Sequence, residues 1–453
     1  MRRLAALCAV LALTLAAGSG CGSGGVRYSH GRVEVRLWHS MSGVTGDALK
    51  KIVDGFNASQ SEYTVVPIFQ GGYADSLKKL VSSLDTSSMP ALIQLDDIEL
   101  RFMVDSHAIA PAQDFVDADA RTPGSHPANL ADFEPRALDY YTLNGKLQAM
   151  PFNLSGPVLY YDRDVFAQAG IDHPPATLDE VRADAQRLLL RNPDGSLKRN
   201  GIALSINGWW LEQMMAKQGA LFANNGNGRQ GLATKVLIDS PAGIAVLSWW
   251  QEMVQSGLAT NVGTSGLQSL LAVVTGKSAM AIESVSALRA IVLALGPASA
   301  RLGVAPMPAP PAPDNSGGMV LGGAAMWIMK DRPLAEQRGA WEFLKYATQP
   351  QVQAQWHYDT GYFPVRVSSW DLEPAASLHR QYPQFAIAHD QVVRSPRNLA
   401  TAGAVIGPFT QVREYEQTAF EQVLVGGKTP QQALATAAKD ADRAIARYNR
   451  SVR

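Results

Sequence analysis

Few residues of this chain have the types and spacing that catalysis requires. The eight histidines are scattered, and none stands at the spacing of a helical metal pair. Asp96 and Asp97 form a carboxylate pair, and two carboxylates about 5–9 Å apart can hydrolyse a glycosidic bond. Adjacent residues on one segment rarely point the same way, so we do not expect glycosidase chemistry from them. His357, beside Trp356, is interpreted as a structural residue.

Two further sequence motifs of enzymes are also absent. Gly276-Lys277-Ser278 resembles the end of a phosphate-binding loop, but the glycine required five residues earlier is Leu271. The chain has no Gly-x-Ser-x-Gly elbow for a serine nucleophile. We therefore predict a protein that is not an enzyme, with no catalytic residue, no metal site and no cofactor. A secreted glycan or phosphodiester hydrolase is the alternative from another functional class.

Length and composition bound the remaining possibilities. The 453 residues suffice for roughly two to three domains. Because 46% of the residues are apolar and 18% are charged, the chain can build hydrophobic cores. Forty basic residues balance forty acidic ones, so the chain lacks the long-range field that drives binding to nucleic acid.

The first twenty-one residues differ in kind from the rest. Arg2 and Arg3 precede a continuous apolar run at 4–17, which is too short to span a membrane and is typical of a signal peptide. Cys21 follows small residues and resembles the cysteine of a bacterial lipobox, although Gly18 stands where that pattern prefers leucine or valine. We predict a signal peptide at 1–21 with Cys21 lipidated; an ordinary secreted protein is the alternative.

Cleavage before Cys21 would remove Cys8, the only other cysteine. The mature protein would then have no internal disulfide, and its stability must come from buried side chains. The glycine- and serine-rich stretch after Cys21 predicts a flexible tether over 22–32.

Strand and helix patterns alternate after the tether. The strands are expected at 33–37, 63–69 and 91–95, because their apolar residues alternate or run continuously. The helices are expected at 49–56 and 77–84, where apolar residues recur on one face. This order predicts a parallel sheet with right-handed crossovers.

The same pattern returns in the second part of the chain. Residues 157–161 form an apolar strand, and Thr177 with Glu180 makes a capping box for the next helix. Residues 429–432 open a long C-terminal helix with the same signature. Two α/β units predict a ligand site between two lobes.

At this point the chain resembles a known family. Residues 157–170, followed by Pro174, Pro175, Thr177 and Glu180, look like the hallmark of extracellular solute-binding proteins of the maltose-binding type. The resemblance runs from about Val33 to the C-terminus. It implies an α/β fold of the periplasmic-binding-protein type, with two hinged lobes and a ligand in the cleft between them.

Within that family the chain is most similar to the branch that binds glycerol-3-phosphate. The shared segments are 38–41, 72–73, 151–155, 321–327, 356–357, 360–364 and 427–434. Actinobacterial relatives in this branch are associated with glycerophosphocholine. The resemblance therefore implies an ABC-importer component that binds glycerol-3-phosphate or a glycerophosphodiester. A binding protein of the same fold for an oligosaccharide is the alternative.

The resemblance also implies a set of ligand contacts. They fall on Tyr73, Asp97, Ser155, Ser284, Gly323, Tyr362 and Arg413, with Trp209 or Trp210 as an aromatic wall. At the position of Asp97 the glycerol-3-phosphate binder carries glutamate, and the glycerophosphocholine binders carry aspartate. The shorter side chain leaves room for a larger head group.

The implied roles follow from side-chain chemistry. Arg413 offers a planar fork for two phosphate oxygens, and Gly323 lets a backbone N–H approach closely. Asp97 would repel phosphate, so it suits glycerol hydroxyls or a choline ammonium. Tyr73 and a tryptophan suit the carbon face of the ligand or its quaternary ammonium. Each also has a structural interpretation, as a salt bridge, cap, packing glycine or core aromatic.

We also predict the boundaries of the two lobes and the partners of the protein. We expect the first lobe at 33–151 and 284–348, and the second at 152–283 and 349–453. Three crossing segments are expected near 149–153, 282–286 and 346–350. The partners would be a small phosphorylated polyol and the permease subunits of the importer. The protein would be a monomer outside the cytoplasm, anchored to the cell membrane by its lipid.

Overall fold

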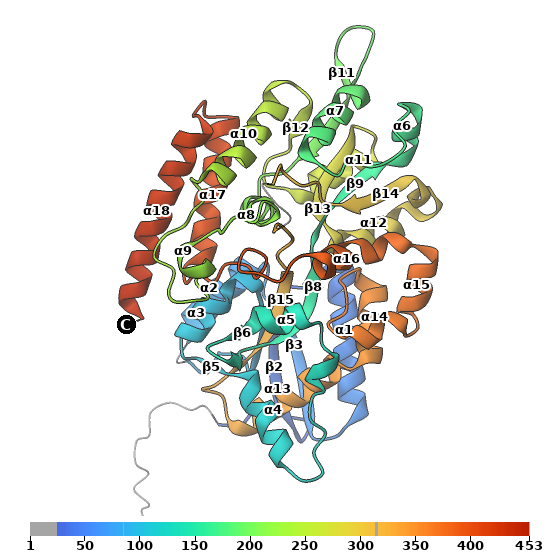
Figure 1. Ribbon diagram of the computed structural model, residues 1–453. Coiled ribbons are helices and arrows are strands. Elements are labelled where there is room, and N and C mark those ends of the chain that lie inside the picture. The colour runs from blue at the N-terminus through green and yellow to red at the C-terminus, as the bar shows by residue number, and fades with distance from the viewer. Residues whose placement is uncertain (1–24, 85, 313–315, 453) are drawn as a thin grey trace, which may run out of the picture.

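The computed structural model describes residues 25–84, 86–312 and 316–452. The predicted signal peptide, Cys21 and the start of the tether lie outside these residues. The described chain forms two lobes, each built on its own sheet (Figure 1). We call the lobe that contains β2 (Arg32–His39) the first lobe and the lobe that contains β9 (Pro157–Asp162) the second lobe. The predicted two-lobed α/β class is thus confirmed.

The first lobe is built on a seven-stranded mixed sheet. The strand β2 pairs in parallel with both of its neighbours from the predicted strand–helix–strand–helix–strand unit. The other strands are β1 (Tyr28–Ser29), β3 (Tyr63–Phe69), β4 (Leu92–Asp96), β5 (Ile109–Ala110), β8 (Met150–Ser155) and β15 (Gly322–Met329). A separate two-stranded ribbon is formed by β6 (Thr142–Leu143) and β7 (Lys146–Leu147).

The second lobe is built on a six-stranded mixed sheet in the order β10-β11-β13-β9-β14, with β12 paired to β11. Besides β9, its strands are β10 (Leu190–Arg191), β11 (Leu197–Leu204), β12 (Ala259–Asn261), β13 (Ser278–Ser284) and β14 (Leu302–Pro306). The antiparallel pairing of β9 with both β13 and β14 puts the predicted strand at 157–161 in the middle of this sheet.

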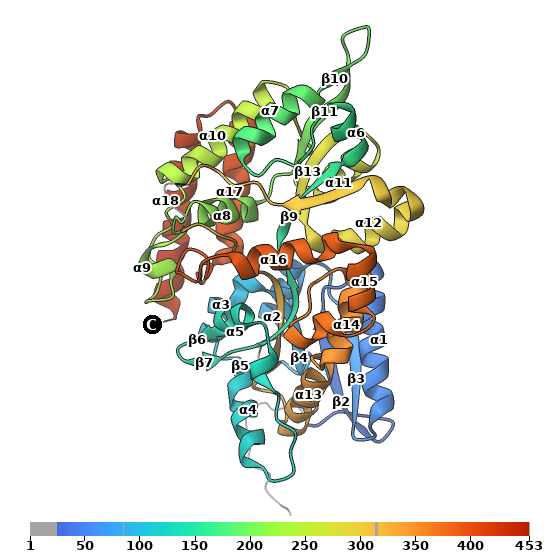
Figure 2. The ribbon, with the colours of Figure 1, turned by 45° about the vertical axis from the view of Figure 1, so that its right-hand side comes forward.

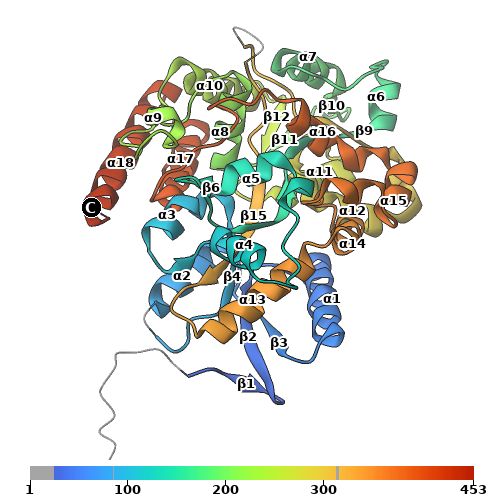
Figure 3. The ribbon, with the colours of Figure 1, turned by 60° about the horizontal axis from the view of Figure 1, so that its bottom comes forward.

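Helices cover both sheets. In the first lobe α1, α2 and α13 surround the strands β2, β3 and β4 (Figure 3). The α-helices are α1 (Gly43–Ser59), α2 (Tyr73–Ser83), α3 (Leu100–Asp105), α4 (Ala112–Arg121), α5 (Pro135–Tyr141), α6 (Arg163–Gln168), α7 (Leu178–Leu188), α8 (Gly208–Lys217), α9 (Asn224–Asn227), α10 (Pro241–Gln255), α11 (Gly266–Val274), α12 (Leu288–Leu295), α13 (Leu334–Ala347), α14 (Pro350–Thr360), α15 (Ala375–Gln381), α16 (Ile387–Arg394), α17 (Phe409–Leu424) and α18 (Pro430–Ser451). The 3-10 turns are η1 (Asp97–Glu99), η2 (Leu130–Asp132), η3 (Val285–Ala287), η4 (Gly296–Arg301), η5 (Val367–Asp371) and η6 (Pro383–Ala386).

The sequence patterns explain these elements locally. The predicted apolar stripe of α1 is its buried face, which includes Leu49, Ile52 and Phe56. At the start of α18 the Thr429 hydroxyl accepts from the backbone N–H of Gln432, and the Gln432 side chain accepts from that of Thr429, so the predicted capping box is present. The buried apolar side chains form two clusters: one joins the core of the first lobe to one face of the second sheet, through residues such as Tyr160 and Val304, and the other lies in the second lobe.

The positions of the crossings differ from those expected. The chain passes between the sheets after Ser155, where β8 ends, and returns between β14 and β15, through residues that include 316–321. It leaves the first lobe for good near α16, which lies between the lobes (Figure 2). The expected crossing near 282–286 is absent, because after β13 the chain forms α12 and rejoins the second sheet as β14.

The expected lobe boundaries need two corrections. Strand β14, assigned to the first lobe, belongs to the second sheet. Helix α14, assigned to the second lobe, packs on α1 of the first lobe, where Lys51 pairs with Asp359 at 3.0 Å and Trp356 joins the core. The residues of these two segments carry no local signal for the lobe that they join. Among the helices of the described ranges, none combines the length and apolar character needed to span a bilayer.

Candidate functional site

A cavity of about 410 Å³ lies between the two lobes. Eight of the nine residues predicted as ligand contacts line it, and only Trp210 does not. They are Tyr73, Asp97, Ser155, Gly323 and Tyr362 from the first lobe or its crossing strands, Ser284 at the end of β13, and Trp209 and Arg413 from the second lobe. Segments separated by more than three hundred residues of sequence therefore meet in one crevice.

A larger cavity, of about 780 Å³, lies elsewhere in the first lobe. It is lined by residues around the end of α1, the segment 125–132 and α13, all within one lobe. Closure of the lobes cannot enclose a solute there, so the interlobe cavity is the better candidate despite its smaller volume. Within the described ranges no cluster of three or more His, Cys, Asp or Glu is arranged to hold a metal ion.

Two adjacent carboxyls form the acidic wall of the first lobe. Asp96 ends β4, and its Oδ1 accepts from the backbone N–H of Asp97 at 3.1 Å. The capping role considered for Asp97 thus belongs to Asp96, although both residues line the cavity. Burial, and then the charges of Asp96 and Glu212, raise the pKa of Asp97 well above its ordinary value. Asp97 therefore keeps a proton at pH values where an exposed aspartate has lost it.

Hydroxyl groups surround this wall. Tyr73 opens α2, and its hydroxyl accepts from Asn153 Nδ2 at 3.1 Å, which leaves its own proton for another acceptor. Ser155 ends β8 and is 5% exposed, at the point where the chain leaves the first sheet. Tyr362 follows the left-handed C-cap of α14 at Gly361 (φ 82°), and its ring stacks on Trp356 with centroids 5.8 Å apart.

A buried histidine, His357, and its half-buried partner His379 fix the backbone of Tyr362. His357 Nδ1 donates to the carbonyl oxygen of Tyr362 at 2.6 Å. Its Nε2 is then the acceptor for the Nε2–H of His379, at 2.7 Å. Burial lowers the pKa of His357 to about 3. The predicted structural role of His357 is confirmed, and it acts directly behind a cavity-lining residue.

Ser284 and Gly323 combine structural roles with positions on the cavity. The Ser284 hydroxyl caps η3 by accepting from the backbone N–H of Ser286 at 3.3 Å. Gly323 has φ +124°, and a Cβ there would lie 2.0 Å from the carbonyl oxygen of Asn153. No side chain fits between β15 and β8 at this point, so glycine is required for the close approach of the two strands.

The two tryptophans take different positions. Trp209 is half-buried and lines the cavity from the N-terminus of α8, where Asn207 Oδ1 accepts from its backbone N–H at 2.9 Å. A Cβ on Gly322 would lie 2.6 Å from Trp209 Cζ2, so this indole lies over the backbone of the first lobe. Trp210 is 1% exposed, and its Nε1–H donates to Ser205 at 3.3 Å. Trp210 is a core residue, and its predicted place on the cavity wall is corrected.

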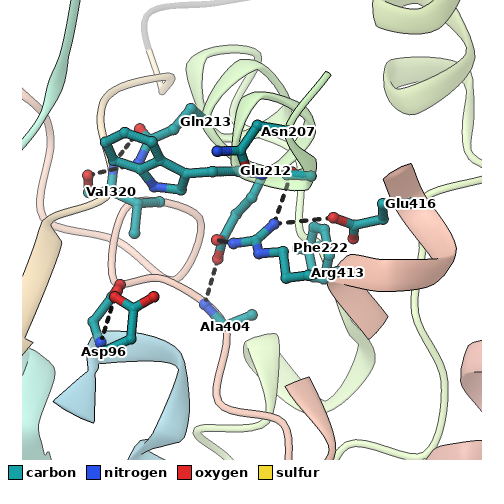
Figure 4. Close-up of polar contacts among 12 residues, drawn as sticks. Asp96, Asn207, Glu212, Gln213, Phe222, Val320, Ala404, Arg413 and Glu416 are labelled. Atoms are coloured by element: carbon teal, nitrogen blue, oxygen red, sulfur yellow. Dashed lines mark hydrogen bonds and ion pairs between the residues drawn. The ribbon is translucent and has the colours of Figure 1, made fainter. Parts of the chain in front are cut away.

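Arg413 lines the second-lobe wall but is already engaged by the protein (Figure 4). Its NH1 donates to the carbonyl oxygen of Gly208 at 2.8 Å and to Glu416 Oε2 at 3.1 Å, and its NH2 donates to Glu212. Burial opposes the charge of this guanidinium, but Glu212 and then Glu416 raise the pKa of Arg413 above its ordinary value. The fork expected to hold two phosphate oxygens therefore holds protein oxygens in this structure.

Sequence reasoning missed several lining residues. Glu99 on η1 accepts from the Thr410 hydroxyl at the start of α17, a contact that joins the lobes. Burial raises the pKa of Glu99 to about 7. Asn207 and Gln417 also line the cavity. Glu416 does not line the cavity, but its contact with Arg413 had a local signal, because residues three apart on a helix lie on one face.

The buried His357 predicts a pH dependence of stability. A histidine whose folded pKa lies near 3, below its unfolded value of 6.5, stabilises the fold fully above pH 6.5, and this contribution is lost as the pH falls toward 3. At about 1.4 kcal/mol per pH unit, wild type should lose about 2 kcal/mol more than His357→Gln between about pH 6.5 and pH 5. Urea unfolding of both proteins across this range measures the difference. Parallel curves would contradict a neutral buried His357.

Comparison with known proteins places the chain in a family. Residues 51–383 match the model of the bacterial extracellular solute-binding proteins. The chain is 31% identical, over 92% of its length and 93% of the relative, to the sn-glycerol-3-phosphate-binding periplasmic protein UgpB of Yersinia pseudotuberculosis serotype I. It is 30% identical to the UgpB of Escherichia coli O1:K1, over 92% of this chain and 94% of that one.

Solved structures share the fold. The UgpB of Mycobacterium tuberculosis in complex with glycerophosphocholine superposes with a TM-score of 0.75 at 21% identity, covering 91% of this chain and 98% of that one. The GacH receptor of Streptomyces glaucescens, solved without ligand and with acarbose, gives a TM-score of 0.74 at 18% identity, covering 92% and 99%. The chain belongs to the bacterial extracellular solute-binding proteins.

Proposed function

We propose that this protein is the substrate-binding component of an ABC importer for glycerol-3-phosphate or a glycerophosphodiester. The main support for this proposal is that eight of the nine ligand contacts implied by the glycerol-3-phosphate branch line one interlobe cavity. Relatives near 31% identity over most of the chain bear the name of sn-glycerol-3-phosphate-binding proteins. The solute would enter the open cleft, the lobes would close, and the closed form would dock on membrane permease subunits.

The chemistry of the cavity favours a diester with a cationic head group over the bare monoester. Among the described residues that line the cavity, Arg413 is the one basic side chain, and two helices, α8 and α17, begin there with their positive dipole ends. These features suit one phosphate group. The opposite wall carries the carboxyls of Asp96, Asp97 and Glu99. An ammonium group beside them favours their ionised forms, which would repel a second negative charge.

Aromatic side chains supply the rest of a head-group site. Tyr73, Tyr362 and Trp209 line the same cavity as the acidic wall. Aromatic faces attract a quaternary ammonium by about 0.5–2 kcal/mol each when the group is desolvated. We therefore place glycerophosphocholine, the molecule named with the Mycobacterium tuberculosis structure, first among the ligands to be tested.

Ligand titration tests this function directly. Isothermal titration of the mature chain with glycerophosphocholine should give saturable binding of one unmodified molecule per chain. Glycerol-3-phosphate should bind more weakly, because it carries about 1.5–2 negative charges at pH 7. Choline and maltose should give no comparable signal. Preferential binding of maltose-like sugars would favour the oligosaccharide alternative, and release of product would favour a hydrolase.

Trp209 provides a second test. Trp209→Ala should weaken glycerophosphocholine binding by about 1–2 kcal/mol, or roughly tenfold, because it removes the indole over the cavity. Trp209→Phe keeps an aromatic face and should retain most of the affinity. Thermal unfolding without ligand is the matched control, since Trp209 is only half-buried and its loss should cost little stability. Unchanged affinity in the alanine variant would remove the aromatic contact from the site.

We also propose that Cys21 carries a lipid that anchors the mature protein, as a monomer, to the outer face of the cell membrane. The family is extracellular, which agrees with a signal peptide before this cysteine. Cys21→Ala should shift the protein from the membrane fraction to the soluble extracytoplasmic fraction, as measured by fractionation and immunoblotting. The binding cavity should be unaffected, so equal ligand affinity is the control. Unchanged membrane association would favour another form of attachment.

A further inference from the structure

A buried cluster of one arginine and two glutamates forms part of the second-lobe wall. Glu212 on α8 and Glu416 on α17 both accept from Arg413, which is 8% exposed. Glu212 has both oxygens paired, because its Oε1 also accepts from the backbone N–H of Ala404 at 3.0 Å (Figure 4). If both carboxyls were ionised, the cluster would carry one uncompensated negative charge away from water, which is costly.

Glu416 is the member with an unfilled contact. It is 0% exposed, and its Oε1 has no hydrogen-bond partner among the described residues. Its Oε2 meets Arg413 and lies against Gly208, where an added Cβ would come within 2.3 Å of it. An unpaired buried carboxylate oxygen is unfavourable, whereas the same oxygen bearing a proton is neutral. Burial raises the pKa of Glu416 to about 8, in spite of Arg413.

The elements that pack on α17 carry further ionisable residues, and only some of these interact with the cluster. The turn η1 and its cap contribute Asp96, Asp97 and Glu99; the carboxyls of Asp96 and Asp97 interact with the charge of Arg413, and that of Glu99 interacts with Asp96. The ionic groups of α10 and α18 are engaged elsewhere or exposed: Glu252 pairs with Arg182, Arg443 pairs with Asp440, Asp442 accepts from Val236, and Lys439, Arg447 and Arg450 are exposed. No second cation from α10 or α18 offsets the acids. Arg229 acts on Glu212, but its guanidinium donates to the carbonyl oxygens of Tyr140, Ala402 and Gly403. Lys217 lies in the last turn of α8, and burial lowers its pKa to about 8.

We infer that Glu416 is a proton-linked specificity residue, which makes the charge of Arg413 available to the anionic group of the solute only while Glu416 is protonated. This inference rests on the proposed function. With Glu416 protonated, Arg413 and Glu212 sum to zero charge, and an anion meets no net repulsion from the cluster. With Glu416 ionised, the cluster is negative and opposes the anion.

The sign of the linkage follows. An anion favours the protonated form, so binding should take up about half a proton per ligand at pH 8 and as much as one proton above it, and affinity should fall as the pH rises above 8. The limiting slope is tenfold per pH unit, so the Kd at about pH 9 should be about tenfold weaker than at about pH 7. Below pH 7 the affinity should no longer change through Glu416.

Titration calorimetry of the mature protein with glycerophosphocholine tests the linkage. This probe is a phosphodiester and has no group that titrates between about pH 7 and pH 9, so any proton uptake belongs to the protein. Measurements in two buffers of different ionisation enthalpy give the number of protons. Wild type should show the tenfold weakening and the uptake. Glu416→Gln, which mimics the protonated acid, should show neither between about pH 8 and pH 9, above the range in which Glu99 titrates.

Glu99→Gln is the matched control, because the pKa of Glu99 lies near 7 and its contribution should appear about one pH unit lower. This variant should keep the fall between pH 8 and pH 9. An unchanged fall in Glu416→Gln would overturn the inference while leaving the proposed function intact. Failure of wild type to bind any glycerol phosphate would instead overturn the proposed function.

A measurement without ligand keeps the inference testable if Glu416→Gln does not fold. Infrared difference spectra of the ligand-free wild type should show one buried protonated carboxyl that ionises between about pH 7 and pH 9, beyond the range of an exposed glutamate. Isotope labelling of glutamate identifies the residue type, and the band should be absent from Glu416→Gln wherever this variant folds. Absence of any such band in wild type would overturn the inference.

Discussion

The structure depends on a strand connection between the lobes, β8 to β9, which is flanked in both sheets by the strands β15 and β14. Strand β8 continues into β9, and β14 leads back into β15; β8 pairs with β15 in the first sheet, and β9 pairs with β14 in the second. Ser155 opposite Gly322 is therefore the last ladder position on one side, and Val158 opposite Pro306 lies just across the gap. The short link from β8 to β9, held by a ladder on each side, allows the lobes to bend about it.

This constraint explains why the cavity lies where it does. Ser155 and Gly323 belong to the crossing strands, so their positions relative to each other are fixed by backbone hydrogen bonds in any lobe arrangement. Trp209 and Arg413 belong to helices of the second lobe, and Asp97 belongs to a turn of the first. A solute held by both groups bridges the hinge, and its contacts change as the lobes close. Binding and closure are thereby coupled through geometry.

The sequence predicted much of this arrangement because the relevant signals are local. Strand alternation, the helix stripe of α1 and the capping box of α18 each depend on a few neighbouring residues. The cavity-lining residues came from segments that resemble a family, so they carried spatial information that periodicity lacks. Trp209 and Trp210 could not be separated in this way, because adjacent residues of a helix differ by rotation alone and either one can face the core.

Long-range partners were beyond such reasoning. Glu212 stands 201 residues from Arg413, and nothing at either position indicates the other. The same holds for β14, whose short apolar pattern fits either sheet. The missed contact between Glu212 and Arg413 concerns charge, which is the property that distinguishes one solute from another in a shared fold.

Three acidic residues at or beside the cavity should differ in protonation between the empty and the filled cleft. Asp97, Glu99 and Glu416 all have raised pKa values, and burial is the first cause in each case. Burial makes the ionised form of each carboxyl unfavourable while the cavity is empty, so each keeps its proton to a higher pH than an exposed acid does. A cationic head group beside Asp97 favours ionisation there, whereas an anion beside Arg413 favours the proton on Glu416. A zwitterionic solute can thus satisfy both walls at once, and a simple anion or cation satisfies only one.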